Sequence, residues 1–537
     1  MTVEVTPRAD TLNAIGDTLE LSATVVAGDS VLDDATISWS SLDPEIATVS
    51  EGRVVGVTNG TARITAVSGD AADTASITVR QILAEIVVSP PTDTLVPGDE
   101  LLLHPAALDS NAVVIDGIDR FTWTTSDDAI IAVDSGGIVE ALATGQATVS
   151  ASYGESEGTA EITVDWLRLD WVGTGLRFTC GLTAAGDAYC WGYNESGQLG
   201  VGDTLSRAEP IRVSGGLTFR ALAVGNWHAC GITAEGKAYC WGANWGGQLG
   251  TETDASYSTV PVPVGLDAEV VSVSGGGLHT CALTASGQAY CWGRNGYGQL
   301  GAEPSIHGTT PVRVSGDRTF TALATGGLHT CGLTADGVAY CWGYNALGQL
   351  GIGANDTLPH IHPAAVSGGL TFTFLEARGN NTCGITGDGT GYCWGVDDRG
   401  EVGDGANSPT CIIGTFEHNC AAAPSAVSAA FAFRSLNPAH GGAGASYACG
   451  IASDGAAYCW GFNFGGNLGT GAADSPDEPT AVVGGHTFRS LSAGGEHTCG
   501  IADDAYTYCW GSNGDGQLGD GSTTLRATPV PVARQGA

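Results

Sequence analysis

Fourteen of the chain's 16 cysteines belong to one motif that recurs seven times after residue 179. The motif reads Cys-x9-Cys-Trp-Gly, and its second cysteines are Cys190, Cys240, Cys291, Cys341, Cys393, Cys459 and Cys509. Each copy continues into a turn such as GQLG and then into a proline-led segment, so one unit takes about 50 residues. Periods of this length are typical of solenoids, propellers and repeat arrays.

The composition favours an all-β fold. Glycine fills 82 of 537 positions, hydrophobic residues make up 43% and charged residues 14%. This argues against disorder and against a collagen helix, whereas frequent glycine suits the tight turns between short strands. Seven complete β-units favour a seven-bladed β-propeller, because a closed ring hides its sheet edges. An extra strand from Ala527 follows the last unit, and we expect it to complete the first blade and close the ring.

The spacing of the two cysteines in each unit predicts a hairpin. In the first unit a three-residue turn at 184–186 would place Thr183 opposite Asp187, and counting outward then pairs Cys180 with Cys190. Gly186 occupies the left-handed position that such a turn needs, and only Ala505 replaces glycine there in the later units. Directly opposed residues have Cα atoms about 4.5–5.5 Å apart, within reach of a disulfide.

We therefore predict eight disulfides, which imply an oxidising compartment. Reduced thiols and zinc are the alternatives, although Cys-x9-Cys is not a CxxC knuckle and the hairpin brings no third or fourth ligand. Seven pairs lie in hairpins and one in an insertion of the fifth unit: Cys180–Cys190, Cys230–Cys240, Cys281–Cys291, Cys331–Cys341, Cys383–Cys393, Cys411–Cys420, Cys449–Cys459 and Cys499–Cys509.

The first part of the chain contains two copies of a different pattern. Trp39-Ser40-Ser41 recurs as Trp123-Thr124-Thr125, and each copy then runs through a glycine turn into alternating strands such as GRVVGVTNGTARITA. Alternation at Ala62, Ile64 and Ala66 places these side chains on one face of a strand. Short strands with frequent turns predict two β-sandwiches of about 80–85 residues each.

Both patterns resemble known families. Residues 1–165, with the run WSSLDPEIATVS, resemble the bacterial immunoglobulin-like group 2 domains of intimin- and invasin-type surface proteins. From about 167 onwards, the HTCGLTADG, AYCWG and GQLG segments resemble the regulator of chromosome condensation repeat. The resemblance implies immunoglobulin-like domains at 1–81 and 82–166 and a seven-bladed propeller at 167–537.

The charge excludes several classes of partner. The formal net charge is −37, from 57 acidic and 20 basic residues, and Lys237 is the only lysine. Nucleic acids and anionic membranes need clustered positive charge, so we expect neither as a partner, and no apolar run is long enough to insert into a bilayer. The start, MTVEVTPRAD, lacks the pattern of a signal peptide. We expect a mature or truncated form of an extracellular or cell-surface protein.

The sequence offers no convincing catalytic or metal-binding set. His228, His279, His329 and His497 share one repeat position, but three units carry Phe178, Asn381 and Tyr447 there instead. Such an interrupted ring favours histidines that donate to backbone between blades. We see no Ser-His-Asp order and no paired carboxylates at repeated offsets, so we predict no enzyme activity, cofactor or metal.

A comparison of the seven units locates a candidate binding surface. Within the frame Trp-Gly-x-Asn-x-x-Gly-Gln-Leu-Gly the x positions vary, and aromatic and arginine side chains recur at them, as protein interfaces favour. Trp245 and Tyr297, flanked by glycines, are expected to be exposed, whereas Tyr193, Tyr344 and Phe462 have packing between blades as an equal alternative. The candidates are Tyr193, Trp245, Arg294, Tyr297, Tyr344, Arg399, Phe462 and Phe464.

These observations favour a secreted or surface-displayed, non-catalytic adhesion or binding protein with a protein or glycan partner. Two alternatives follow from family resemblance: guanine-nucleotide exchange, and inhibition of an enzyme as in the propeller-type β-lactamase inhibitor. About 16 residues exceed the repeat period around the fifth unit, at 404–423 and near 437–444. The first of these insertions is predicted to be an ordered loop because it contains Cys411 and Cys420.

Overall fold

A computed structural model describes the chain except at residues 254, 304–306, 407, 414, 440–445 and 537. Two compact units are present, Met1–Trp166 and Leu167–Ala537. The described residues form strands, bridges and turns without a helix, as the sequence predicted. No helix in this described part is therefore long and apolar enough to span a membrane.

The first unit contains two immunoglobulin-like sandwiches. Ala62, Ile64 and Ala66 are fully buried, which confirms the alternation read from the sequence. The first sandwich consists of three sheets, each given in strand order. One contains β1 (Thr2–Thr6), β4 (Ser22–Ala27) and β5 (Ser30–Val31), and another contains β2 (Ala9–Leu12), β10 (Ala71–Val79), β9 (Gly60–Ser68) and β6 (Ser38–Ser41). The third contains β3 (Thr18–Glu20), β8 (Arg53–Gly56) and β7 (Ala47–Ser50). The second sandwich also consists of three sheets. One contains β11 (Glu85–Ser89) and β14 (His104–Leu108), and another contains β12 (Thr92–Leu95), β19 (Ser156–Val164), β18 (Gly145–Tyr153) and β15 (Thr122–Thr125). The third contains β13 (Glu100–Leu102), β17 (Ile138–Ala141) and β16 (Ile131–Val133).

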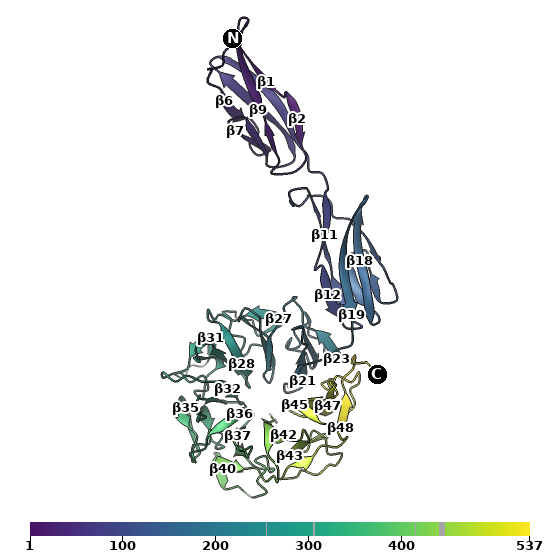
Figure 1. Cartoon of the computed structure of the whole chain (residues 1–537). Helices are drawn as coiled ribbons and strands as arrows, with labels where there is room; N and C mark the ends of the chain where they lie inside the picture. Colours follow the sequence, from purple (N-terminus) through teal and green to yellow (C-terminus); the bar gives the residue numbers. More distant parts are fainter. Residues whose placement is uncertain (254, 304–306, 407, 414, 440–445, 537) are drawn as a thin grey trace. The chain divides into compact units, whose positions relative to one another are not determined.

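The second unit consists of seven antiparallel sheets, or blades, arranged around an axis (Figure 1). Six have four strands in chain order, and the fifth has an extra hairpin strand. Blade one contains β20 (Trp171–Thr174), β21 (Phe178–Leu182), β22 (Ala188–Gly192) and β23 (Arg207–Arg212), and blade two contains β24 (Ala221–Val224), β25 (His228–Ile232), β26 (Ala238–Ala243) and β27 (Tyr257–Pro263). Blade three contains β28 (Val270–Gly275), β29 (His279–Thr284), β30 (Ala289–Arg294) and β31 (His307–Arg313), and blade four contains β32 (Ala322–Thr325), β33 (His329–Leu333), β34 (Ala339–Asn345) and β35 (Asp356–Ala365). Blade five contains β36 (Phe372–Arg378), β37 (Asn381–Thr386), β38 (Gly391–Val396), β40 (Phe416–Ala426) and β39 (Thr410–Ile413). Blade six contains β41 (Phe433–Pro438), β42 (Tyr447–Ala452), β43 (Ala457–Gly461) and β44 (Thr480–Ala481). Blade seven contains β45 (Phe488–Ala493), β46 (His497–Ala502), β47 (Thr507–Gly511) and β48 (Arg526–Pro531).

The cysteine hairpins have the predicted register. Cys180 pairs with Cys190 across β21 and β22, and the turn between them closes through a hydrogen bond from the Thr183 amide to the Asp187 carbonyl. Gly186 has a φ of +91°, and Ala505 takes the same left-handed conformation in blade seven. Each of the seven hairpin cystines joins Cα atoms 4.0–4.1 Å apart, slightly closer than expected. An eighth disulfide joins Cys411 to Cys420, whose Cα atoms are 6.0 Å apart.

The expectation that the C-terminal strand completes blade one is wrong. β48 pairs with β47, so it is the outer strand of blade seven, while β23 supplies the outer strand of blade one. The reason is that the proline-led strand follows the cysteine hairpin of its own unit and folds back onto it. Blades one and seven contact each other through backbone and side-chain hydrogen bonds. The Gly495 amide donates to the Gly175 carbonyl at 3.1 Å, and the Trp191 indole donates to the Gln517 carbonyl at 3.0 Å.

We predict that Gly200→Ala destabilises the propeller by about 1–3 kcal/mol. Gly200 has a φ of +71°, and an added Cβ would lie 2.8 Å from the Trp241 ring of the next blade. Gly296→Ala is the matched control, because no heavy atom lies within 4 Å of its added Cβ. Urea unfolding of both variants measures the difference, and equal midpoints would contradict this account of the blade contact.

Candidate functional site

The joints between blades all use the tryptophan of the Trp-Gly motif. Each indole is fully buried, and its Nε1–H donates to a backbone carbonyl in the glycine-rich turn of the preceding blade, at 2.9–3.1 Å. The pairs are Trp191–Gln517, Trp241–Gln198, Trp292–Gln248, Trp342–Gln299, Trp394–Gln349, Trp460–Glu401 and Trp510–Asn467. These turns are therefore fixed parts of the scaffold.

Two amide side chains occupy matching positions in six of these seven turns. In blade one, Asn194 Oδ1 accepts a hydrogen bond from the Leu199 amide, and Gln198 Oε1 accepts one from the Ser196 amide. Asn194 Nδ2 donates to the carbonyls of Asp203 and Leu205, which ties down the segment leading to β23. The x positions of the turn lie between these fixed points, so their side chains vary without changing the backbone. We call the side of the propeller formed by the seven turns the turn face.

The repeated histidines lie beneath the turn face and join neighbouring blades. The Nε2 atoms of His228, His279, His329 and His497 lie 2.8–2.9 Å from threonine hydroxyls of the next blade. In all four joints the threonine hydroxyl in turn donates to a glutamine carbonyl of a turn; the threonines are Thr179, Thr280, Thr330 and Thr382. The expected donation from histidine to backbone is therefore corrected to donation to a hydroxyl, because the threonine stands between the ring and the carbonyl.

Burial keeps these four imidazoles neutral. It lowers the pKa of His228, His329 and His497 to about 3 and that of His279 to about 4. Each Nδ1 is buried without a hydrogen-bond partner. Because the pKa values are lower in the folded than in the unfolded state, these groups favour folding above about pH 6.5 and lose that contribution progressively as the pH falls towards their folded values.

We predict that His329→Asn makes stability less sensitive to acid. The variant lacks the Thr382 contact and should lose about 1–3 kcal/mol at neutral pH. Between about pH 6.5 and 4, however, the free energy of unfolding of the variant should fall less steeply than that of the wild type. The difference in slope should correspond to the binding of about one proton. Urea unfolding across this range measures both effects, with the exposed His104→Asn as control. An unchanged slope in His329→Asn would show that the imidazole is not held neutral by burial.

Seven of the eight candidate residues gather into three clusters, each spanning a joint, and Arg294 is the candidate outside them. At the joint of blades one and two, the Tyr193 ring lies 5.9 Å from Trp227, which lies 6.0 Å from Trp245. The Tyr193 hydroxyl donates to Glu195 at 2.5 Å, and this bond raises the pKa of Tyr193 to about 12. The Arg177 guanidinium lies over the Tyr193 ring and pairs with Asp515 of blade seven at 2.6 Å. The result is an aromatic surface with charged edges.

The other two clusters are smaller. Tyr297 of blade three and Tyr344 of blade four have ring centroids 4.6 Å apart. Phe462 and Phe464 of blade six stack at 6.2 Å, and the guanidinium of Arg399, from blade five, lies 5.3 Å from the Phe462 ring.

The exposed fractions separate the candidates. Trp245 is 50% and Phe464 52% exposed, and Arg399 is exposed as well. Tyr297 is half-buried because its ring packs against Tyr344, so the expectation that Tyr297 is exposed holds only in part. Tyr193, Arg294, Tyr344 and Phe462 are also half-buried.

Sequence reasoning missed Trp227. It directly precedes the repeated histidine, and its carbonyl accepts the amide hydrogen bond of Ala243, the residue after Trp-Gly. Arg177 has the same relation to Tyr193. The position before the histidine varies between units as freely as the x positions do, and this variation was the available signal.

The insertion of blade five is an ordered hairpin where it is described. β39 and the first part of β40 pair with each other beyond the end of β38. Asp398, at an x position of the turn, anchors the hairpin by accepting from the Asn419 amide at 2.6 Å and by pairing with His418 at 2.7 Å. Ile412 and Phe416 are 64% and 71% exposed. Residues 440–445 of the second insertion lie outside the described residues.

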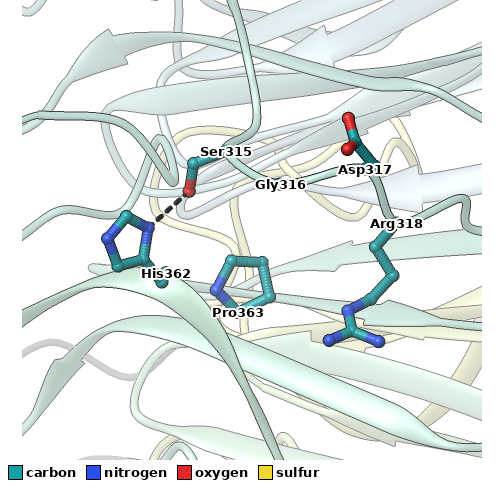
Figure 2. A pocket seen from close by; sticks show the side chains of 6 residues that line it. All are labelled: Ser315, Gly316, Asp317, Arg318, His362 and Pro363. Atoms are coloured by element: carbon teal, nitrogen blue, oxygen red, sulfur yellow. Dashed lines mark hydrogen bonds between the residues drawn. The ribbon is translucent and has the colours of Figure 1, made fainter.

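Figure 2 shows a hollow of about 410 Å³ that contains a serine, a histidine and an aspartate. Ser315 Oγ lies 2.7 Å from His362 Nδ1 and donates to the Ile361 carbonyl at 3.2 Å. The Asp317 carboxylate points away from His362 (Figure 2). It pairs instead with Arg313 at 3.6 Å. These three side chains therefore do not form the relay that activates a nucleophilic serine.

The geometry defines an all-β protein in which two immunoglobulin-like sandwiches precede a disulfide-bonded seven-bladed propeller. By sequence, the chain belongs to the RCC1-like domain family, whose model matches residues 162–434. RCC1 repeats match 454–501 and 488–517, and bacterial immunoglobulin-like domains of group 2 match 1–79 and 84–164. Both family resemblances read from the sequence are confirmed.

Individual relatives cover only parts of the chain. Ice-binding protein 1 of Shewanella frigidimarina is 35% identical over 28% of this chain and 17% of its own length. The ultraviolet-B receptor UVR8 of Arabidopsis thaliana is 32% identical over 25% of this chain and 31% of its own length. Among solved structures, human WBSCR16 aligns over 65% of this chain and 94% of its own, with 21% identity and a TM-score of 0.56. Prp20p of Saccharomyces cerevisiae aligns over 68% and 87%, with 21% identity and a TM-score of 0.56. At these identities the structures show the fold alone.

Proposed function

We propose that this protein is a secreted or cell-surface, non-catalytic adhesion or binding protein that contacts a protein or glycan through the turn face. The observation that carries the proposal is the placement of aromatic side chains across the joints, where Trp245 and Phe464 remain half exposed on a rigid scaffold. Large, rigid aromatic side chains give contact area at little entropic cost, which is why they dominate interface energetics.

The location rests on the disulfides. Every one of the 16 cysteines is paired, and seven of the eight disulfides lie in the interior of the propeller. Such pairing forms and persists in oxidising surroundings. Bacterial immunoglobulin-like domains at 1–79 and 84–164 suit spacers that present the propeller outside the cell.

We expect Trp245→Ala and Phe464→Ala to fold normally and each to weaken partner binding by about 1–3 kcal/mol, as interface anchors do. The partner is first captured from the producer's extracellular medium with the wild-type chain and identified by mass spectrometry. Tyr153→Ala serves as control, because Tyr153 is 44% exposed but lies in the immunoglobulin-like unit. If both propeller variants retain wild-type affinity, the turn face is not the contact surface.

The blade-five hairpin supplies a second prediction for the same assay. Replacing 411–420 by a Gly-Ser turn removes the exposed Ile412 and Phe416 together with the Cys411–Cys420 disulfide. We expect partner binding to be abolished while the seven blades stay folded, because both apolar side chains face solvent. The thermal midpoint should fall only by what the disulfide and the Asp398 contacts contribute. Full binding by this variant would restrict the contact to the turns themselves.

Guanine-nucleotide exchange is the alternative that the family suggests, and the structurally similar Prp20p has binding properties towards Gsp1p and histones. The net charge of −37 disfavours a chromatin partner, and the disulfides disfavour the cytosol, where small GTPases act. Nucleotide release from a small GTPase in the presence of the chain tests this alternative directly. Inhibition of a secreted enzyme would be a special case of binding through the turn face.

A further inference from the structure

The turn of blade five differs from the others in the two side chains that shape it. Six blades carry asparagine at the first position and an amide, glutamine or asparagine, at the second. Blade five has Asp397 and Glu401 there. Both carboxyl groups occupy the places of neutral amides inside the fold: Asp397 is 4% and Glu401 1% exposed.

The two carboxyl groups differ in their hydrogen bonds. Glu401 Oε2 accepts from the Arg399 amide at 2.7 Å, and Asp397 Oδ1 accepts from the Val402 amide at 3.0 Å. Hydrogen bonding from Ser408 also favours the ionised form of Asp397, whereas Glu401 Oε1 is buried and has no hydrogen-bond partner. A glutamine in this place, such as Gln349 in blade four, leaves a neutral NH2 group unpaired, whereas an ionised Glu401 leaves a charge.

The charges around this turn are mainly negative. Asp398 and Asp404 belong to the same loop, and Asp477 and Glu478 of blade six lie against Gly400 and Gly405. The basic side chains here are His418, which is bonded to Asp398, and the exposed Arg399, which lies over Phe462. Burial and the neighbouring Asp397 and Asp398 raise the pKa of Glu401 to about 7, and burial raises that of Asp397 as well.

The same turn forms the joint between blades five and six. The Trp460 indole donates to the Glu401 carbonyl at 3.1 Å, and the Trp460 ring packs against Gly403. The Arg399 amide that binds Glu401 belongs to the residue whose guanidinium covers Phe462 of blade six. A change of charge on Glu401 therefore acts on a contact between blades and on one cluster of the turn face.

We propose that the joint between blades five and six is a proton-dependent element, held closed by a neutral Glu401 carboxyl group and loosened when that group ionises. A protonated carboxyl has nearly the shape and polarity of the glutamine that closes the other joints. An ionised one is a buried charge without a counterion, which is costly. No three acidic, histidine or cysteine groups in the described part of the chain are placed to hold a metal ion.

The direction of the effect follows from linkage. The pKa of Glu401 is higher in the folded chain than the usual 4.5, so its contribution to stability is complete below about pH 4.5. The contribution is lost as the pH rises towards about 7 and does not change further above that value. Global unfolding would mix this effect with that of Glu376, whose pKa is also raised, to about 6, by burial. A local measurement is therefore required.

Hydrogen–deuterium exchange of the full-length chain, read by mass spectrometry between about pH 5.5 and 8.5, supplies that measurement. After correction for the intrinsic pH dependence of exchange, the turn at 397–405 should lose protection severalfold across the range. The equivalent turn at 345–351 in blade four should not. Glu401→Gln should abolish the loss, and Gln349→Glu should create one in blade four.

The outcomes separate the alternatives. Equal pH dependence of the blade-five turn in wild type and Glu401→Gln would overturn the proposal. So would restoration of full protection at high pH by millimolar calcium in wild type but not in Glu401→Gln, because the carboxylates would then be a cation site. The measurement uses no partner, so it succeeds or fails independently of the proposed binding function.

Discussion

The hydrogen bond from a buried indole to the turn of the preceding blade is the interaction on which the propeller depends. It occurs at all seven joints with nearly the same length, and the turn that accepts it ends in a glycine against the same indole ring. The tryptophan can lie flat against the backbone only where no Cβ intervenes, as at Gly200 and Gly519. One contact therefore fixes both the spacing of the blades and the backbone of the turns.

This arrangement separates stability from recognition. The amide side chains and glycines of each turn bond inward, while the x positions between them project from a backbone that they do not determine. Aromatic side chains such as Trp245 can therefore vary from blade to blade at little cost to the fold. Seven of the disulfides add to this rigidity from within, because each links the two central strands of its own blade.

The sequence predicted the blades, the hairpin register and the cysteine pairs because these depend on local spacing. Thr183 and Asp187 close their turn within five residues, and the pairing of Cys180 with Cys190 then follows from the two-residue period of a strand. Contacts between units were harder to predict. The C-terminal strand was assigned to the wrong blade because the order of strands along the chain does not determine whether the last strand pairs with blade seven or with blade one. Trp227 was missed because its role depends on Tyr193, a residue of the neighbouring blade.

The exceptions to the repeat show that the joint, rather than the single unit, is the element that must remain consistent. Five joints offer a threonine hydroxyl from the next blade. In four of them the facing residue is histidine, as with His329 and Thr382, and in the fifth it is Tyr447, whose hydroxyl lies 2.8 Å from that of Thr498. Where the next blade has Ala229 or Ala448 instead, the histidine position holds Phe178 or Asn381.

A second compensation involves the residue three positions before the histidine position of each blade. Gly225, Gly276 and Gly326 leave room for the histidine rings, whereas blade five combines the smaller Asn381 with Arg378. The Arg378 guanidinium reaches the carbonyls of Thr174 and Val224 in blades one and two. Large and small side chains thus exchange places as pairs, and blade five departs from the repeat at its inner strand, its turn and its hairpin together. The inner strand and the hairpin of this blade are compensated by their own contacts, and only the turn keeps an unpartnered buried group, Glu401 Oε1. Blade five thus has the features of a specialised element rather than of an eroded repeat.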